Sequence, residues 1–312
     1  MNLIKYGIFI ESIKKGLVFL KLSSFVDFIK SKIQDSQIKV NYTGQEAADN
    51  IFKLLNSDKP VMICRFGQME LDALKQLKEI DLGIKKFNLS GFNGLKVNAG
   101  FFPLNKNLLK KFQKRMLCDI KQIDILGSWL FNEIYFKQEL ENSIKVELMD
   151  LEPYYCSRPW SRVFKGKKIL VIHPFEKTII SQYKSQKKLF DNVNVLPKFE
   201  LKTLKAVQSI GGESDKFKDW FEALKYMEKK IDSIDFDIAL IGCGAYGLPL
   251  AAYIKRKGKK AVHLGGGLQL LFGIKGKRWE NQNFKYFNKY WVSPSEEEKP
   301  KCFKKVEDGC YW

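Results

Sequence analysis

The sequence is short of the residues that most often build metal sites, disulfide frameworks and membrane spans. Only two of its 312 residues are histidine, and no two of its six cysteines have the close spacing of a zinc or redox motif. A zinc site is therefore not expected, and the cysteines indicate reduced thiols in an intracellular protein. No apolar run approaches the roughly 18 residues that a membrane-spanning helix needs. What is left is a globular chain whose 24 Phe, 12 Tyr and 6 Trp require a sizeable core.

Acidic residues are also in short supply. Asp and Glu number 35 against 54 Lys and Arg, which gives a formal net charge of +19. Such an excess favours nucleic acid, an anionic membrane surface or phosphate-bearing small molecules as partners. A lysine-rich coding background would produce the same excess, so the charge alone does not select among them. Because the basic residues are scattered and no nucleic-acid-binding motif is present, no nucleic-acid partner is predicted.

The first 40 residues form a lysine-rich stretch of their own. Ile10, Ile13, Leu17 and Leu20 recur at helical spacing, with lysines largely on other faces. This pattern is typical of an interfacial helix on an anionic membrane, and equally of a helix that packs on the domain. No small-residue cleavage site follows, so a secretory signal is not expected. We predict a helical extension over residues 1–40 of a cytoplasmic protein, with peripheral attachment to the inner membrane face left open.

From residue 41 onward, helical and strand-like segments alternate. Thr43 and Glu46 have the spacing of a capping box at a helix start, and Leu71, Leu74 and Leu77 share one face of a later helix. Continuous apolar strands separated by helices predict a largely parallel sheet covered on both faces. The predicted strands are Val61–Cys64, Ile123–Leu126, Lys145–Met149, Lys168–Ile172, Phe236–Ile241 and Ala261–Leu264.

The composition shows no break that would divide this region into two domains. We therefore predict an α/β fold with a single Rossmann-like domain over residues 41–291. An irregular tail over residues 292–312 follows, and its last residues, Tyr311 and Trp312, are expected to dock on the body.

Ligands of open α/β sheets bind beyond the carboxyl ends of the strands, and the first candidate site lies there. Arg65, Gly67, Gln68 and Glu70 directly follow the strand at 61–64. Glycine permits a tight strand-to-helix turn, arginine suits a phosphate, and glutamate suits a metal, a sugar hydroxyl or a proton. Because a helix N-terminus favours negative charge, the glutamate is expected to stay ionised and to be a weak base. The alternative is an Arg–Glu pair that only fixes the turn.

Two glycine-rich turns follow later strands. Gly242, Gly244 and Gly247 form a G-x-G-x-x-G between a strand and a helix, which suits an anion at a helix N-terminus or simply close packing. The next strand lacks the acidic residue that would hold the ribose of a dinucleotide, so NAD is not expected. Gly265 and Gly266 begin the second turn, whose free amides predict an anion-binding nest.

Polar side chains complete the candidates. His173 and Glu176 follow the strand at 168–172, where the histidine suits a base or a donor to phosphate, or is a strand-end histidine with only a structural role. The segment 199–203, with Gln208, is a weaker polar cluster. Positive charge and an amide follow the second glycine turn, at Gln269, Lys275, Lys277 and Arg278.

The segment Arg65-Phe-Gly-Gln-Met-Glu70 resembles the RFGDGE segment of bacterial GT-D-fold glycosyltransferases, which occur in glycoprotein and surface-polysaccharide gene clusters. The similarity extends over the strand–helix order of roughly residues 45–280. It implies a Rossmann-like GT-D-type domain, a UDP-sugar donor, and Mn²⁺ or Mg²⁺ bound by the Asp and Glu of the motif. Gln68 stands where the family has Asp, and an amide substitutes poorly for a carboxylate on such a cation. Glu70 alone therefore leaves the implied metal site incomplete, and lysines or glycine-rich amides are the alternative partners of the diphosphate.

We predict a glycosyltransferase that moves a sugar from a UDP-linked nucleotide-sugar donor to a glycan or lipid-linked acceptor in surface-polysaccharide biosynthesis. The rival interpretation is a non-catalytic relative that binds a nucleotide-sugar or phosphosugar and has lost its metal site. The predicted catalytic residues are Glu70, His173 and Glu176. The predicted donor-binding residues are Arg65, Gly67, Gln68, Gly242, Gly244, Gly247, Gly265, Gly266, Gln269, Lys275, Lys277 and Arg278.

Overall fold

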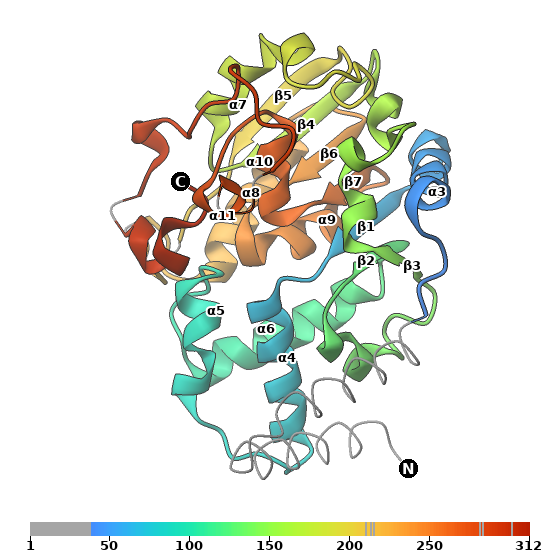
Figure 1. Ribbon diagram of the computed structural model, residues 1–312. Helices are drawn as coiled ribbons and strands as arrows, with labels where there is room; N and C mark the ends of the chain where they lie inside the picture. The colour runs from blue at the N-terminus through green and yellow to red at the C-terminus, as the bar shows by residue number, and fades with distance from the viewer. Residues whose placement is uncertain are drawn as a thin grey trace, which may run out of the picture.

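Seven strands form one sheet in the order β3-β2-β1-β7-β6-β4-β5, and each neighbouring pair is parallel (Figure 1). The structure is a computed structural model that describes residues 39–209, 211–212, 214, 216–280, 282, 284–300 and 302–312. Residues 1–38 of the helical extension predicted over residues 1–40 lie outside the described residues. The strands are Val61–Arg65 (β1), Ile125–Ser128 (β2), Ile144–Glu147 (β3), Lys168–His173 (β4), Glu200–Lys205 (β5), Ile238–Ile241 (β6) and Lys260–His263 (β7).

The predicted α/β fold with a Rossmann-like parallel sheet is confirmed, and each of the six predicted strands overlaps an observed one. Strand β5 was missed, and its neighbourhood was interpreted as a polar cluster. It is an edge strand whose two leucines are separated by Lys202 and Thr203, so it has no apolar run to mark it. The domain boundaries at residues 41 and 291 stay predictions.

Helices cover both faces of the sheet. The face packed against the even positions of β1, such as Met62 and Cys64, carries α4 (Gln68–Asp81), α6 (Lys106–Ile120), α8 (Trp220–Asp232) and α9 (Gly247–Arg256). The opposite face, with Val61 and Ile63, carries α3 (Gly44–Asn56), α7 (Glu176–Tyr183) and α10 (Leu268–Leu271). Two short helices, α5 (Asn93–Val97) and α11 (Lys277–Glu280), lie in connecting segments. Because both faces are covered, the central strands are apolar throughout, which explains why the sequence pattern predicts them.

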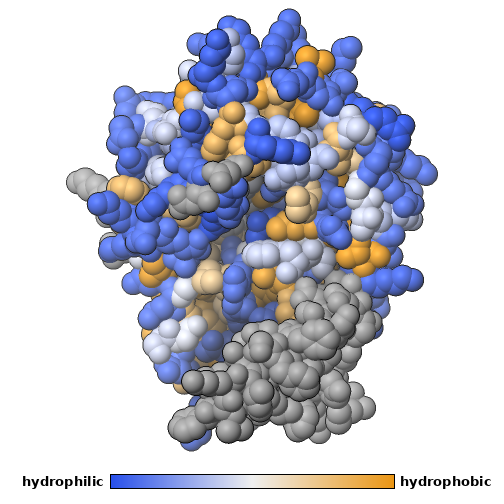
Figure 2. Space-filling view, in the orientation of Figure 1, coloured by the Kyte–Doolittle hydropathy of each residue, from blue (hydrophilic) through white to orange (hydrophobic). Residues whose placement is uncertain are grey.

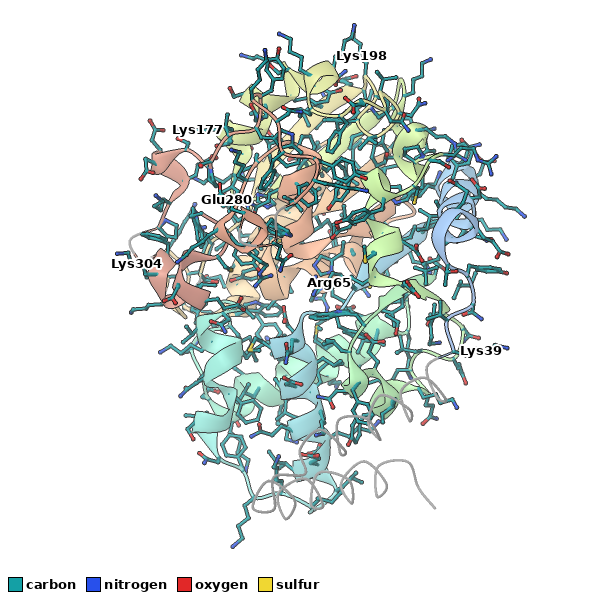
Figure 3. All side chains as sticks on the ribbon, viewed as in Figure 1. Lys39, Arg65, Lys177, Lys198, Glu280 and Lys304 are labelled. Atoms are coloured by element: carbon teal, nitrogen blue, oxygen red, sulfur yellow. The ribbon has the colours of Figure 1, made fainter. Side chains whose placement is uncertain are left out.

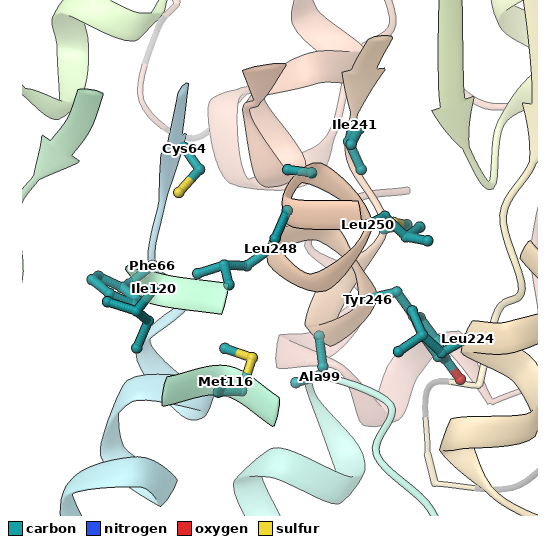
Figure 4. Close-up of a cluster of buried hydrophobic side chains, with 14 of the residues drawn as sticks. Cys64, Phe66, Ala99, Met116, Ile120, Leu224, Ile241, Tyr246, Leu248 and Leu250 are labelled. Carbon is teal, nitrogen blue, oxygen red and sulfur yellow. The ribbon is translucent and has the colours of Figure 1, made fainter. Parts of the chain in front are cut away.

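The first of these cores is tightly filled. Leu71, Leu74 and Leu77, the predicted helix face of α4, are fully buried there. Figure 4 shows Cys64 of β1 and Leu248 of α9 among the side chains of this core. Replacing one such leucine by alanine costs about 2–5 kcal/mol, so this packing fixes the position of α4 and of the residues at its start.

The capping box predicted for Thr43 is wrong in its chemistry. Thr43 is the N-cap of α3, but its side chain makes no capping hydrogen bond. The amide of Gly44 instead donates to Oδ1 of Asp150 at 2.9 Å, so a distant carboxylate satisfies the helix start. Among the described residues, no helix is long and apolar enough to cross a membrane.

Candidate functional site

A cavity of about 390 Å³ lies beyond the carboxyl ends of the strands, where ligands of such sheets bind. Figure 2 shows a hollow in the middle of the face drawn there, and in Figure 3 the labelled Arg65 lies near the centre of the molecule, where β1 leads into α4. The volume falls within the range of small-molecule sites. The predicted residues that line it are Arg65, Gly67, Gln68, Glu70, His173, Gly242, Gly244, Gly265, Gly266, Gln269 and Arg278.

Arg65 brings a guanidinium group into the cavity. Its Nε donates to the carbonyl of Phe66 at 3.0 Å, and its guanidinium lies 4.6 Å from the ring centroid of Trp129. Burial lowers the pKa of Arg65, while Tyr311 and Glu70 act against that shift. The group stays charged at neutral pH, because an arginine pKa starts above 12. Its terminal nitrogens make no hydrogen bond or ion pair to a described residue, so they are available to an anion.

Trp129 lines the cavity and was not predicted. It follows β2, and its indole Nε1 donates to the same Phe66 carbonyl at 3.0 Å. Its loop is held by the buried carboxylate of Glu133, which accepts hydrogen bonds from the Ser128 hydroxyl and from the amides of Trp129 and Leu130. A tryptophan three residues beyond a predicted strand was a signal in the sequence, but nothing local showed that β2 lies beside β1.

Glu70 folds back over the start of its own helix. Gly67 is the N-cap of α4 with an ordinary φ of −80°, yet a Cβ on it would collide with the Glu70 carboxylate. The position of the Glu70 carboxylate therefore requires a residue without a side chain here, whereas the backbone conformation of the turn does not. Burial raises the pKa of Glu70, and its own backbone amide and Arg65 only partly offset this. The expectation that the helix dipole would make this group a weak base is wrong, because desolvation outweighs the dipole.

The motif does not fit a protein-held divalent cation. Mn²⁺ and Mg²⁺ take about six oxygen ligands, usually with carboxylates among them. Here Glu70 is buried against its own backbone, and Gln68 offers only an exposed amide. Within the described part of the chain, no group of three or more His, Cys, Asp or Glu side chains is placed to hold a metal.

Both histidines of the sequence line the cavity, although only His173 was predicted. Nδ1 of His173 accepts a hydrogen bond from the amide of Phe175 at 3.0 Å, so the proton of the neutral ring is on Nε2. Burial lowers the pKa of His173 to about 3, and burial followed by the charge of Arg65 lowers that of His263 to about 3. His173 is thus a hydrogen-bond donor rather than a base at neutral pH.

The glycine turns bring the backbone close to these side chains. Gly244 has a φ of +56° and Gly265 a φ of +61°, which a residue with a side chain rarely adopts. The Cδ atom of Arg65 would lie 3.5 Å from a Cβ on Gly265, so the arginine runs along this turn. Gly242 and Gly265 are in contact with each other across the ends of β6 and β7. The backbone of both turns is therefore presented to the cavity beside Arg65.

Four predicted residues are not among those lining the cavity. Gly247 packs against the His263 ring, where a Cβ would collide with Nε2. Lys275 lies over the Phe287 ring, and Nζ of Lys277 donates to the carbonyl of Asp308 at 3.5 Å. The fourth, Glu176, begins α7. Predictions of donor binding or catalysis by these four are therefore not supported by their positions.

The C-terminal segment, residues 302–312, forms another wall of the cavity. Glu307, Tyr311 and Trp312 line it, and the Arg278 guanidinium pairs with the Glu307 carboxylate. Gln269, predicted to bind the donor, instead donates through Nε2 to the carbonyl of Tyr311 at 3.2 Å. The docking expected of the last two residues is confirmed, because Trp312 packs edge-to-face on Phe175. Their place in the cavity wall was not foreseen.

Comparisons with known proteins give little sequence similarity. No protein-family profile matches the chain, and no curated protein matches it. A solved selenomethionine-substituted structure of domain of unknown function 1792 is similar, with a TM-score of 0.45 and 12% identity over 86% of this chain and 96% of that one.

Proposed function

We propose that this chain is a glycosyltransferase that takes a sugar from a nucleoside-diphosphate donor, UDP-linked, and passes it to a glycan or lipid-linked acceptor in surface-polysaccharide assembly. The resemblance of residues 65–70 to the glycosyltransferase motif supports the reaction type. The observation that carries the proposal is Arg65, whose charged guanidinium lies in the cavity with its terminal nitrogens unpaired by any described residue. Such a fork of N–H donors matches the oxygens of a phosphate.

The donor's diphosphate needs positive charge as it departs, and two guanidinium groups supply it. Arg278 lines the same cavity as Arg65, and its charge is close enough to lower the pKa of Arg65 further, after the larger effect of burial. The Nε2–H of His173 and the backbone of Gly265 and Gly266 add neutral donors. Donors placed in advance around a departing anion lower the barrier without reorganisation during the reaction.

Glu70 is proposed as the proton acceptor for the incoming hydroxyl. As the acceptor oxygen bonds to the anomeric carbon, the bond from that carbon to the diphosphate breaks with its electron pair. The hydroxyl proton passes to the Glu70 carboxylate. Because burial raises the pKa of Glu70, it takes up a proton more readily than an ordinary glutamate.

A second candidate is a protein that binds the nucleotide-sugar without transferring it. It is favoured by the Glu70 carboxylate, which is folded against its own helix, and by Gln68, which leaves the motif with one acid. The two proposals predict the same binding and differ only in turnover.

Calorimetric titration with UDP, followed by a turnover assay with UDP-sugars, tests both proposals. Binding of UDP that survives EDTA and is lost in Arg65→Ala supports the diphosphate site. Release of UDP from a UDP-sugar in the presence of acceptor, lost in Glu70→Gln, supports the transferase. Binding of UDP without its release from a UDP-sugar would support the non-catalytic binding protein. Failure to bind any nucleoside diphosphate would reject both proposals.

A further inference from the structure

One carboxylate reaches the cavity from the C-terminal segment, and it is already paired with a cavity arginine. Glu307 contacts Nη2 of Arg278, while Arg65 forms no ion pair with a described residue. The side chains of Glu307 and Arg278 are 48% and 33% exposed. Ion pairs with that much solvent contact contribute little free energy, so a stronger anion is able to replace the glutamate.

The backbone around Glu307 is anchored independently of this pair. The amide of Arg278 donates to the carbonyl of Cys310 at 3.0 Å, and Gln269 holds the carbonyl of Tyr311. The Tyr311 ring packs on Gly266, where a Cβ would collide with it. The Glu307 side chain can therefore leave Arg278 by rotation while the segment itself stays in place.

The turn that presents Glu307 is strained. Glu307 and Asp308 have φ values of 44° and 53°, a region that residues with side chains rarely occupy, and Gly309 follows with a φ of 78°. Such conformations persist where the surrounding contacts enforce them, and they cluster at ligand-binding sites. Here the enforced turn directs a carboxylate at an arginine of the cavity.

We propose that Arg278 is a second anion site of the cavity, that Glu307 is its resident ligand, and that the second phosphate of a nucleoside diphosphate displaces Glu307. The proposal rests on the proposed function and adds a rule of specificity to it. One phosphate is bound at Arg65, which forms no ion pair with a described residue, and the other must compete with Glu307. The affinity for a monophosphate that occupies only the Arg65 position should not depend on Glu307, whereas the affinity for a diphosphate should.

Glu307→Gln tests the proposal, with Glu296→Gln as its matched control. Glu296 belongs to the same tail, pairs with Lys299 at 2.7 Å, and does not line the cavity. Calorimetry with UDP and with UMP measures both affinities in the full chain. We expect Glu307→Gln to bind UDP about fivefold more tightly, since one exposed ion pair is no longer broken, and to bind UMP as the unmodified chain does. Glu296→Gln should change neither affinity.

The reverse variant, Arg278→Gln, keeps the test decisive if Glu307→Gln disturbs the turn. It should lower the affinity for UDP to nearly that for UMP, and combining it with Glu307→Gln should have no further effect. Unchanged or weaker UDP binding in Glu307→Gln, with UDP still bound by the unmodified chain, would overturn this inference and leave the proposed function intact. If neither protein binds UDP, both fail.

Discussion

The two walls of the cavity are held by different kinds of contact. The wall at the strand ends is fixed by the sheet, in which Arg65 is paired in register with Gly127 of β2. The wall formed by residues 302–312 is fixed by a side-chain hydrogen bond from Gln269, by a backbone hydrogen bond from Arg278 to Cys310, and by an exposed ion pair between Arg278 and Glu307. The first wall is rigid because the cores on both faces of the sheet hold it. The second can exchange one of its contacts without unfolding, which suits a part of the site that responds to ligand.

The two walls also differ in the roles that we assign to their residues, which are catalysis in one and ligand selectivity in the other. The strand-end wall carries Glu70, Arg65 and His173, which we assign to proton transfer and to the binding of one phosphate of the donor. The C-terminal wall carries Tyr311 and Glu307, together with Arg278 as the ion-pair partner of Glu307, and we assign these residues to the choice of ligand. Substitutions in the first wall should therefore change turnover or UDP affinity by larger factors than substitutions in the second.

The largest expected effect is at Glu70. Glu70→Gln should lower turnover about 10²-fold or more, the usual scale for a lost acid–base group, and leave the fold and UDP affinity nearly unchanged. Glu79→Gln is the control, because Glu79 is also buried on α4 but pairs with Lys75 and Lys85 away from the cavity. Steady-state kinetics and thermal unfolding separate the two. Full turnover in Glu70→Gln would remove this residue from the mechanism.

Arg65 comes second. Arg65→Ala should weaken UDP binding about 10- to 100-fold, the range for a lost charge-assisted hydrogen bond, whereas Arg278→Ala should weaken it less because its charge is already neutralised by Glu307. Arg158→Ala is the control, since that exposed arginine pairs with Asp49 and does not line the cavity. Equal losses in the two cavity variants would break the distinction between the walls.

Lowering the pH should reduce the free energy of unfolding through His173, which belongs to the strand-end wall. His173 has a pKa of about 3 in the folded chain and near 6.5 when unfolded, so below pH 6.5 only the unfolded chain takes up the proton. The free energy of unfolding therefore falls as pH drops from 6.5 toward 3, by up to about 1.4 kcal/mol per pH unit for this one group.

Urea unfolding at pH 7.5 and pH 5.5 checks this. His173→Gln should lose about 1 kcal/mol less than the unmodified chain between the two pH values. Glu70 and Glu133, whose pKa values are raised by burial, act in the opposite direction, because their folded forms bind protons first. They are present in both proteins and largely cancel in the comparison. An identical loss in the two proteins would mean that His173 is not buried as a neutral ring.

The smallest effect is expected from glycines that touch a functional side chain in each wall. A Cβ on Gly67 would collide with the Glu70 carboxylate, and one on Gly266 with the Tyr311 ring. Gly67→Ala should lower turnover about tenfold by misplacing an acid–base group. Gly266→Ala should change UDP affinity only about threefold, on the scale of a weak contact. A larger effect from Gly266→Ala than from Gly67→Ala would show that the C-terminal wall controls the chemistry.

Part of the site could be predicted from the sequence because its residues lie next to a strand along the chain. Arg65, Gly67, Glu70 and His173 follow apolar runs that are buried on both faces, and the carboxyl ends of parallel strands meet at one edge. Trp129 follows β2 and His263 is the last residue of β7, but whether they reach the site depends on which strands are neighbours. The order of strands is set by crossovers that local periodicity does not encode.

The sequence by itself determined the parallel α/β sheet, six of its strands and the Arg65–Glu70 segment, because burial on both faces and strand-end turns leave local patterns. Only the tertiary structure decided that Glu70 is buried enough for its pKa to rise, that both histidines are neutral, and that Glu307 neutralises Arg278. Each of these depends on desolvation or on charges brought together from distant positions. Glu307 lies 29 residues from Arg278 along the chain, and only the folding of the C-terminal segment onto the strand ends makes it part of the same site.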